Sequence, residues 1–100
     1  MSTRPVYVVD GARTPFLRAQ AEPGAFSAAD LAVSAGRPVL ARLPITPSNI
    51  DEVIVGCVIP AADEANIARI ISLRLGCPDR VPAFSVQRNC ASGLQAIASA

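Results

Sequence analysis

The sequence predicts an α/β fold with parallel strands. Along the 100 residues, short apolar segments alternate with longer segments of helical spacing, in the order strand, helix, strand, helix, strand, helix. Most of the strand segments are apolar throughout, which is typical of parallel strands that are buried on both faces. Elements that alternate in this way form βαβ units with right-handed crossover connections.

Three segments have the character of strands. The first, residues 6–9, is a run of β-branched and aromatic residues. The second, residues 53–59, contains Cys57 among Val and Ile, so we expect Cys57 to be a mid-strand core residue. The third covers residues 83–87.

The first helix is predicted to start at a capping box, because Ser27 and Asp30 have the S-x-x-D spacing. Gly36 and Pro38 lie inside this segment and weaken the helix there. The apolar residues of its expected buried stripe are Leu31, Ala35, Val39, Leu40 and Leu43.

The second helix follows the acidic pair Asp63 and Glu64, which we interpret as capping and solvated residues at a helix N-terminus. Its apolar face consists of Ile67, Ile70, Ile71 and Leu75, and residues 76–78 (Gly-Cys-Pro) form its stop.

The third helix is predicted within residues 90–100, a stretch without a charged residue. A helix that lacks a polar face is normally buried on all sides, so we expect Leu94 and Ile97 to be buried in the complete protein. The segment ends without a helix stop. We therefore expect residues 1–100 to be the first part of a longer domain, cut inside a helix.

The composition excludes several classes of function. Nine basic and eight acidic residues leave a net charge of +1, which offers no basic patch for nucleic acid. The absence of His, and of any C-x-x-C pair among the three cysteines, argues against a metal site. Unpaired thiols suit a reducing compartment, so we expect a cytoplasmic protein. No apolar run approaches the roughly 20 residues of a membrane span.

One junction has the features of a reactive site. Cys90 follows a buried strand and opens a helix, where the helix dipole stabilises a thiolate. Small residues at positions 91–93 leave room for a substrate and for backbone N–H groups to face an oxyanion. Ligands of α/β sheets also gather at the carboxyl ends of strands. From spacing alone, a buried structural cysteine is an equally good interpretation of Cys90. Cys77 lies at a helix stop and is interpreted as incidental.

Three motifs resemble those of the thiolase family. They are D-G-A-R-T-P-F at residues 10–16, N-I-A-R at residues 66–69 and N-C-A-S-G-L-Q-A at residues 89–96. They occur in the family's order and span nearly the whole chain. The last is the most specific, because it surrounds the family's nucleophilic cysteine, and it favours Cys90 as a nucleophile over a structural cysteine.

The resemblance implies a layered helix–sheet–helix–sheet–helix fold, of which this chain is the first βαβαβα part of the N-terminal half. It implies an acyl-CoA acyltransferase that cleaves 3-ketoacyl-CoA or condenses acyl-CoA. Cys90 would carry the acyl group as a thioester, and its backbone N–H would donate to the oxyanion. The family's His and second Cys would lie outside this chain, so the 100 residues alone are expected to be inactive. Coenzyme A would be a substrate, with no resident cofactor and no metal.

Residues 61–65 stand where many thiolases have a Gly-rich turn, and residues 18–26 differ from the short Gly-rich segment that is common in biosynthetic members. Both departures favour a thiolase of fatty-acid oxidation. The resemblance also implies a homo-oligomer, with a fatty-acid-oxidation partner subunit as a further option. Two alternatives stay open. One is a ketoacyl-synthase-like condensing enzyme with a cysteine at the same place, and the other is a non-catalytic α/β packing module, if the chain is complete as given.

Overall fold

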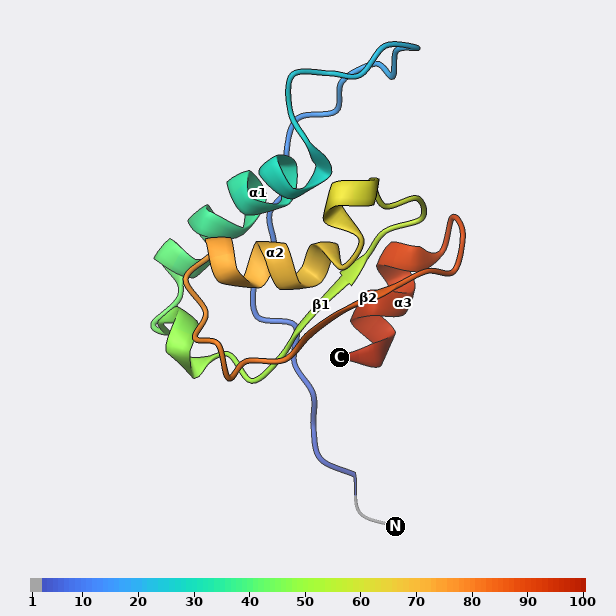
Figure 1. Cartoon of the computed structure of the whole chain (residues 1–100). Helices are drawn as coiled ribbons and strands as arrows, with labels where there is room; N and C mark the ends of the chain where they lie inside the picture. Colours follow the sequence, from blue (N-terminus) through green and yellow to red (C-terminus); the bar gives the residue numbers. More distant parts are fainter. Residues whose placement is uncertain (1–2) are drawn as a thin grey trace.

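The computed structural model describes residues 3–100, so that Met1 and Ser2 lie outside it. Over these residues the structure is an α/β arrangement built around two parallel strands, β1 and β2 (Figure 1). The elements are α1 (Ala28–Arg42), β1 (Val53–Gly56), α2 (Ile67–Arg74), β2 (Ala83–Val86) and α3 (Ser92–Ser99), with 3₁₀ helices at Pro47–Asn49 and Ala62–Glu64.

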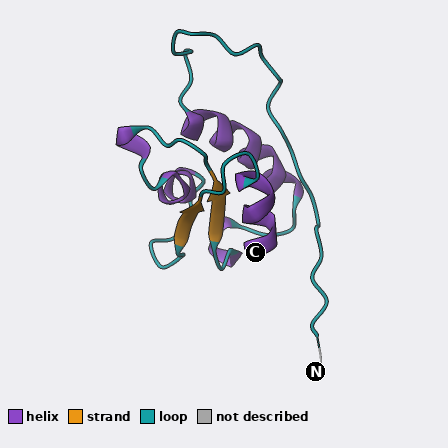
Figure 2. Ribbon diagram, turned by 90° about the vertical axis from the view of Figure 1, so that its right-hand side faces the viewer, coloured by secondary structure: helices purple, strands orange, loops and turns teal. Residues whose placement is uncertain are grey.

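The two strands lie between helices. Pairing runs in register from Val53 opposite Ala83 to Gly56 opposite Val86, and α2 connects the two strands. Helix α2 packs on both strands and against α1, whereas α3 packs mainly on β1 (Figure 2). Because neighbouring residues of a strand point to opposite faces, Val55 faces the core under α1 and α2 while Gly56 meets α3.

The core is centred between α1 and α2. Its buried side chains are Ala29, Val33, Ile67 and Ile71. The partly buried residues that pack against them are Ala32, Val55, Cys57, Ile70 and Leu75. The predicted buried face of α2 is confirmed. The stripe predicted for α1 is wrong at its first position, because Leu31 is exposed and the helix meets α2 through Ala29 and Val33 instead.

Helix α1 begins at the predicted capping box. The Ser27 hydroxyl accepts a hydrogen bond of 3.1 Å from the Asp30 amide, and the Asp30 carboxylate accepts one of 2.9 Å from the Ser27 amide. The carboxylate of Glu64 accepts a further hydrogen bond of 3.1 Å from the Ala29 amide. Glu64 is therefore a cap, but of α1 instead of the helix that follows it, and the solvation that we expected for it is wrong because Glu64 is buried.

The stop of α2 is confirmed. Gly76 has a φ of 91°, a left-handed conformation that glycine adopts without strain. Its amide donates to the carbonyl of Leu73 over 3.1 Å, and the amide of Cys77 donates to the carbonyl of Ser72 over 3.0 Å. This is the hydrogen-bond pattern of a Schellman motif, which satisfies carbonyl groups at the end of a helix.

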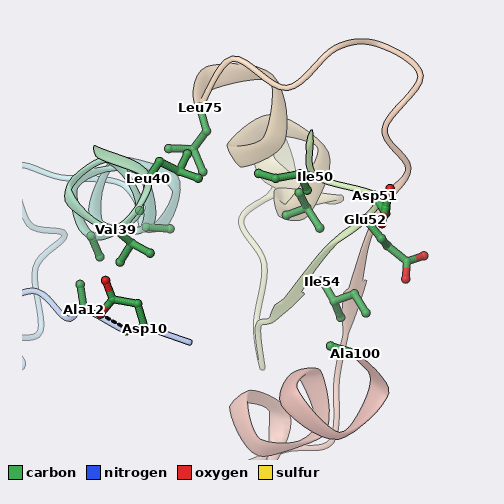
Figure 3. Close-up of a pocket in the computed structure, with 15 residues that line it drawn as sticks. Asp10, Ala12, Val39, Leu40, Ile50, Asp51, Glu52, Ile54, Leu75 and Ala100 are labelled. Carbon is green, nitrogen blue, oxygen red and sulfur yellow. Dashed lines mark hydrogen bonds between the residues drawn. The ribbon is translucent and has the colours of Figure 1, made fainter. Parts of the chain in front are cut away.

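The predicted strand at residues 6–9 is absent from the described structure. Their exposed fractions run from 75% for Val9 to 87% for Val8, and the segment has no strand partner. One edge of β1 pairs with β2, but the other borders a cavity of about 910 Å³ that separates β1 from α1 and from residues 10–12 (Figure 3). Asp10 lies on the α1 side of this cavity (Figure 3). Its carboxylate forms a salt bridge with Arg42 of α1, with 3.0 Å between Arg42 Nε and Asp10 Oδ2.

The second strand is shorter than predicted. It ends at Gly56, and both Val58 and Ile59 are exposed. Cys57 therefore lies just beyond β1 rather than in mid-strand, where its amide donates to the carbonyl of Val86 over 3.1 Å. Its half-buried side chain packs against the core, as expected.

Helix α3 begins at Ser92, two residues later than the predicted start. Within this chain Leu94 and Ile97 are exposed by 71% and 66%, because α3 contacts the strands along one side only. Their burial in the complete protein stays a prediction. None of the helices in the described part is long and apolar enough to cross a membrane.

Candidate active site

Cys90 lies in the turn that joins β2 to α3. Strand β2 ends at Val86, and Ala91 is the N-cap of α3, so that Cys90 stands directly before the N-terminus of the helix, as predicted. It is exposed, whereas Cys57 is half-buried and Cys77 is buried. An exposed thiol beside a helix N-terminus is accessible to a substrate, unlike a structural cysteine of the core.

The backbone of this turn has an uncommon conformation at Asn89, whose φ is 48°. Among residues other than glycine, asparagine tolerates this left-handed region best. The side chain of Gln87 accepts a hydrogen bond from the Asn89 amide, and the Ala91 amide donates to the Arg88 carbonyl over 3.0 Å. The turn that presents Cys90 is thus held by local hydrogen bonds on both sides of the cysteine.

Ser92 supplies two further hydrogen bonds to the same turn. Its hydroxyl accepts from the Arg88 amide over 2.8 Å and donates to the Asn89 carbonyl over 2.7 Å. Ser92 is only 5% exposed, so these bonds are shielded from water. The sequence marks Ser92 only as a small residue, because the hydrogen-bond partners of its hydroxyl are set by the turn and not by helical spacing.

The first turn of α3 rests directly on β1. A Cβ atom built on Gly56 would lie 2.5 Å from the carbonyl carbon of Ser92 and 2.7 Å from the amide nitrogen of Gly93. Such distances are far below van der Waals contact, so only glycine fits at this position. Gly56 therefore sets how closely the residues after Cys90 approach the sheet.

Most amides of the turn are already paired. The N–H groups of residues 88, 89, 91 and 92 donate to the Ser92 hydroxyl, the Gln87 side chain, the Arg88 carbonyl and the Asn89 carbonyl, respectively. The Cys90 amide has no such partner within residues 3–100. It is thus the amide of this turn that is available to a ligand.

Two arginine side chains, one of them close to Cys90 in the sequence, have interaction partners of their own. Arg88 donates to the side chain of Gln95 over 2.8 Å, along the surface of α3. Arg13 lies 4.9 Å from the centre of the Phe16 ring, in a cation–π arrangement.

The parallel strands, the crossover helix and the cysteine at a strand-to-helix turn define an α/β protein with a candidate nucleophile. Residues 6–100 match the family model "Thiolase, N-terminal domain". The chain therefore belongs to the thiolase family, as its three motifs indicated.

Similar proteins agree with this assignment. Over 98 residues the chain is 36% identical to acetyl-CoA acetyltransferase IA of Candida tropicalis, covering 97% of this chain and 24% of that protein. It is 40% identical to the mitochondrial 3-ketoacyl-CoA thiolase of Mus musculus over 96% of this chain and 24% of that protein. The chain thus spans about a quarter of the length of the curated relatives it matches.

The fold is also shared. The crystal structure of human mitochondrial 3-ketoacyl-CoA thiolase in complex with CoA matches with a TM-score of 0.69 and 36% identity, over 75% of this chain and 19% of that one. The fold class is thereby confirmed: the chain has the α/β architecture of the N-terminal part of a thiolase.

Proposed function

We propose that the intact protein is an acyl-CoA acyltransferase of the thiolase type, with the Cys90 thiolate as its nucleophile. The observation that carries the proposal is the exposed Cys90 at the turn between β2 and the N-terminus of α3. Membership of the thiolase family supports it, and it favours a thiolase over a ketoacyl-synthase-like enzyme or a packing module.

The reaction proceeds through a thioester on Cys90. The thiolate attacks the keto carbonyl of a 3-ketoacyl-CoA, the bond between its second and third carbons breaks, and acetyl-CoA leaves after its second carbon takes up a proton. The remaining acyl group stays on Cys90 until the thiol of free CoA attacks it, which releases a shortened acyl-CoA and restores the cysteine. Condensation of two acyl-CoA molecules is the reverse sequence. Such a two-step scheme is covalent catalysis with ping-pong kinetics.

One feature of the turn supports this chemistry. The Cys90 amide has no hydrogen-bond partner among the described residues, so it would donate to the oxyanion that forms when the sulfur attacks the carbonyl.

The proton transfers need groups outside these 100 residues. The chain contains no His, and the family resemblance assigns the base that activates the cysteine to a His in a later motif. A positioned base is typically worth about 10²- to 10⁴-fold in rate. We therefore expect the 100-residue chain alone to be inactive.

The substrate and setting extend the same proposal. Coenzyme A is proposed as a substrate, supported by the solved human thiolase in complex with CoA. The role in fatty-acid oxidation, the cytoplasmic location, the homo-oligomeric state and a partner subunit stay predictions from the sequence.

The test compares three cysteine variants of the intact protein in a thiolysis assay with a 3-ketoacyl-CoA. Cys90→Ser is expected to abolish turnover, because serine is a far weaker nucleophile at neutral pH. Cys57→Ser and Cys77→Ser serve as matched controls and are expected to keep most of the activity. Near wild-type turnover by Cys90→Ser would overturn the proposal.

A further inference from the structure

We propose that Ser92 is a positioning residue for Cys90, and that its hydroxyl sets the rate at which Cys90 is acylated. This inference rests on the proposed function and assigns a role to a residue that lies two positions after the nucleophile. Ser92 acts on the position of Cys90 through hydrogen bonds to the backbone of Arg88 and Asn89. It takes no part in bond formation or proton transfer.

The geometry of the hydroxyl carries the argument. It accepts from the Arg88 amide over 2.8 Å and donates to the Asn89 carbonyl over 2.7 Å, so that its donor and one acceptor position are both used. Both partners belong to the two residues that precede Cys90. A single buried side chain, which follows Cys90 in the chain, is therefore hydrogen-bonded to the two residues that precede Cys90.

The conformation of the turn needs such a closure. Asn89 adopts a φ of 48°, a sparsely populated region for residues other than glycine. Conformations of this kind persist only where surrounding interactions hold them. The Ser92 hydroxyl binds the carbonyl of that same residue, so its removal lets the turn relax and moves Cys90.

Ser92 is itself fixed in place. It is 5% exposed, and its backbone rests on Gly56 at the end of β1. The backbone of Ser92 is therefore fixed against the sheet, and the hydrogen bonds of its hydroxyl fix the turn relative to the sheet.

A second buried serine provides a matched control. Ser72 of α2 is fully buried, and its hydroxyl has no hydrogen-bond partner among the described residues. Ser72→Ala removes the same atom as Ser92→Ala from a buried position, but it breaks no hydrogen bond among the described residues. It is expected to leave the acylation of Cys90 unchanged.

The measurement is the rate of acyl transfer from acetyl-CoA to Cys90 in the intact protein, followed by rapid quenching and mass spectrometry. We expect Ser92→Ala to lower this rate by about 10- to 100-fold, since small displacements of a reacting group have effects of this size. The affinity for acetyl-CoA is expected to change little, so the loss falls on the rate constant and not on binding. Purely structural damage would lower both.

A pair of isosteric variants separates the hydroxyl from side-chain bulk. Ser92→Thr keeps the hydroxyl, whereas Ser92→Val has the same shape without it. We expect Cys90 to be acylated at least about 10-fold faster in the Ser92→Thr variant than in the Ser92→Val variant. This factor is the lower end of the loss of rate that we expect when the hydroxyl is removed.

Each outcome decides. Equal acylation rates for Ser92→Ala and Ser72→Ala, or for the Thr and Val variants, would overturn the inference while leaving the proposed function intact. A Ser92→Ala protein that fails to fold would also overturn it, since Ser92 would then be a residue of the fold. A wild-type protein that forms no acyl-Cys90 would instead overturn the proposed function.

Discussion

Gly56 and Ser92 are in direct backbone contact, and this contact seats α3 on β1. A Cβ atom on Gly56 would stand 2.5 Å from the carbonyl carbon of Ser92. The closeness of the two residues fixes the distance between the end of the sheet and the turn that presents Cys90. The position of the candidate nucleophile therefore depends on the smallest residue of β1.

Gly56→Ala tests this dependence. The added methyl group collides with backbone atoms, which cannot rotate away as a side chain would, so α3 must shift. We expect a loss of stability of about 1–3 kcal/mol, typical of overpacking. We also expect a loss of thiolysis activity in the intact protein on the order of 10²-fold. Thermal unfolding and the activity assay measure the two effects.

Gly24→Ala is the control for that substitution, because no heavy atom other than those of Gly24 and its two chain neighbours lies within 4 Å of a Cβ at Gly24. It is expected to leave both stability and activity near the wild-type values. A Gly56→Ala protein that behaves like the Gly24→Ala protein would show that the contact does not constrain the site.

The neighbouring acidic residues Asp63 and Glu64 are expected to differ in their contribution to stability. Glu64 is buried and accepts a hydrogen bond from the Ala29 amide, whereas Asp63 is exposed. Glu64→Ala leaves a buried amide of α1 without a partner, which costs about 1–3 kcal/mol. Asp63→Ala changes an exposed residue and is expected to stay within about 0.5 kcal/mol. Chemical denaturation of the two variants decides, and equal losses would contradict the capping role of Glu64.

The Asp30 carboxyl makes the stability of the folded protein depend on pH in the acidic range. The hydrogen bond from the Ser27 amide, and next the one from the Arg74 side chain, lower the pKa of the Asp30 carboxyl below its usual value. Because the pKa is lower in the folded state than in the unfolded state, the carboxylate stabilises the fold fully above its unfolded pKa of about 3.9. This contribution is lost as the pH falls through the folded pKa.

Asp30→Asn removes this titration. We expect the variant to be less stable than the wild type at neutral pH, and the difference to shrink as the pH is lowered below about 4. Thermal midpoints between neutral and strongly acidic pH give the comparison. A difference that stays constant over this range would exclude Asp30 as a source of the pH dependence.

Features that depend on neighbouring residues in the chain could be predicted from the sequence. The capping box of Ser27 and Asp30, the stop at Gly76 and the apolar face of α2 are all as expected, because each is set within one or two turns of helix. The place of Cys90 between a strand and a helix was predictable for the same reason.

Features that depend on distant partners were missed. Residues 6–9 have strand character, but a segment becomes a strand only when it pairs with another strand. Among the described residues they pair with no strand, and the edge of β1 that faces away from β2 is unpaired. The burial of Glu64 and the contact of Gly56 with α3 arise where separate elements pack together. No local pattern marks such residues, since an acidic residue at a helix start and a glycine at a strand end have simpler explanations.

The most direct test of the central claim is the identification of the acylated residue. The intact protein is incubated with acetyl-CoA, quenched in acid and digested, and the peptides that contain Cys57, Cys77 and Cys90 are examined by mass spectrometry. We expect an added acetyl group on the peptide that contains Cys90, its loss when free CoA is added, and no such group on the Cys57 and Cys77 peptides. An acetyl group on Cys57 or Cys77, or none on Cys90 while the protein turns over substrate, would contradict the assignment of Cys90 as the nucleophile.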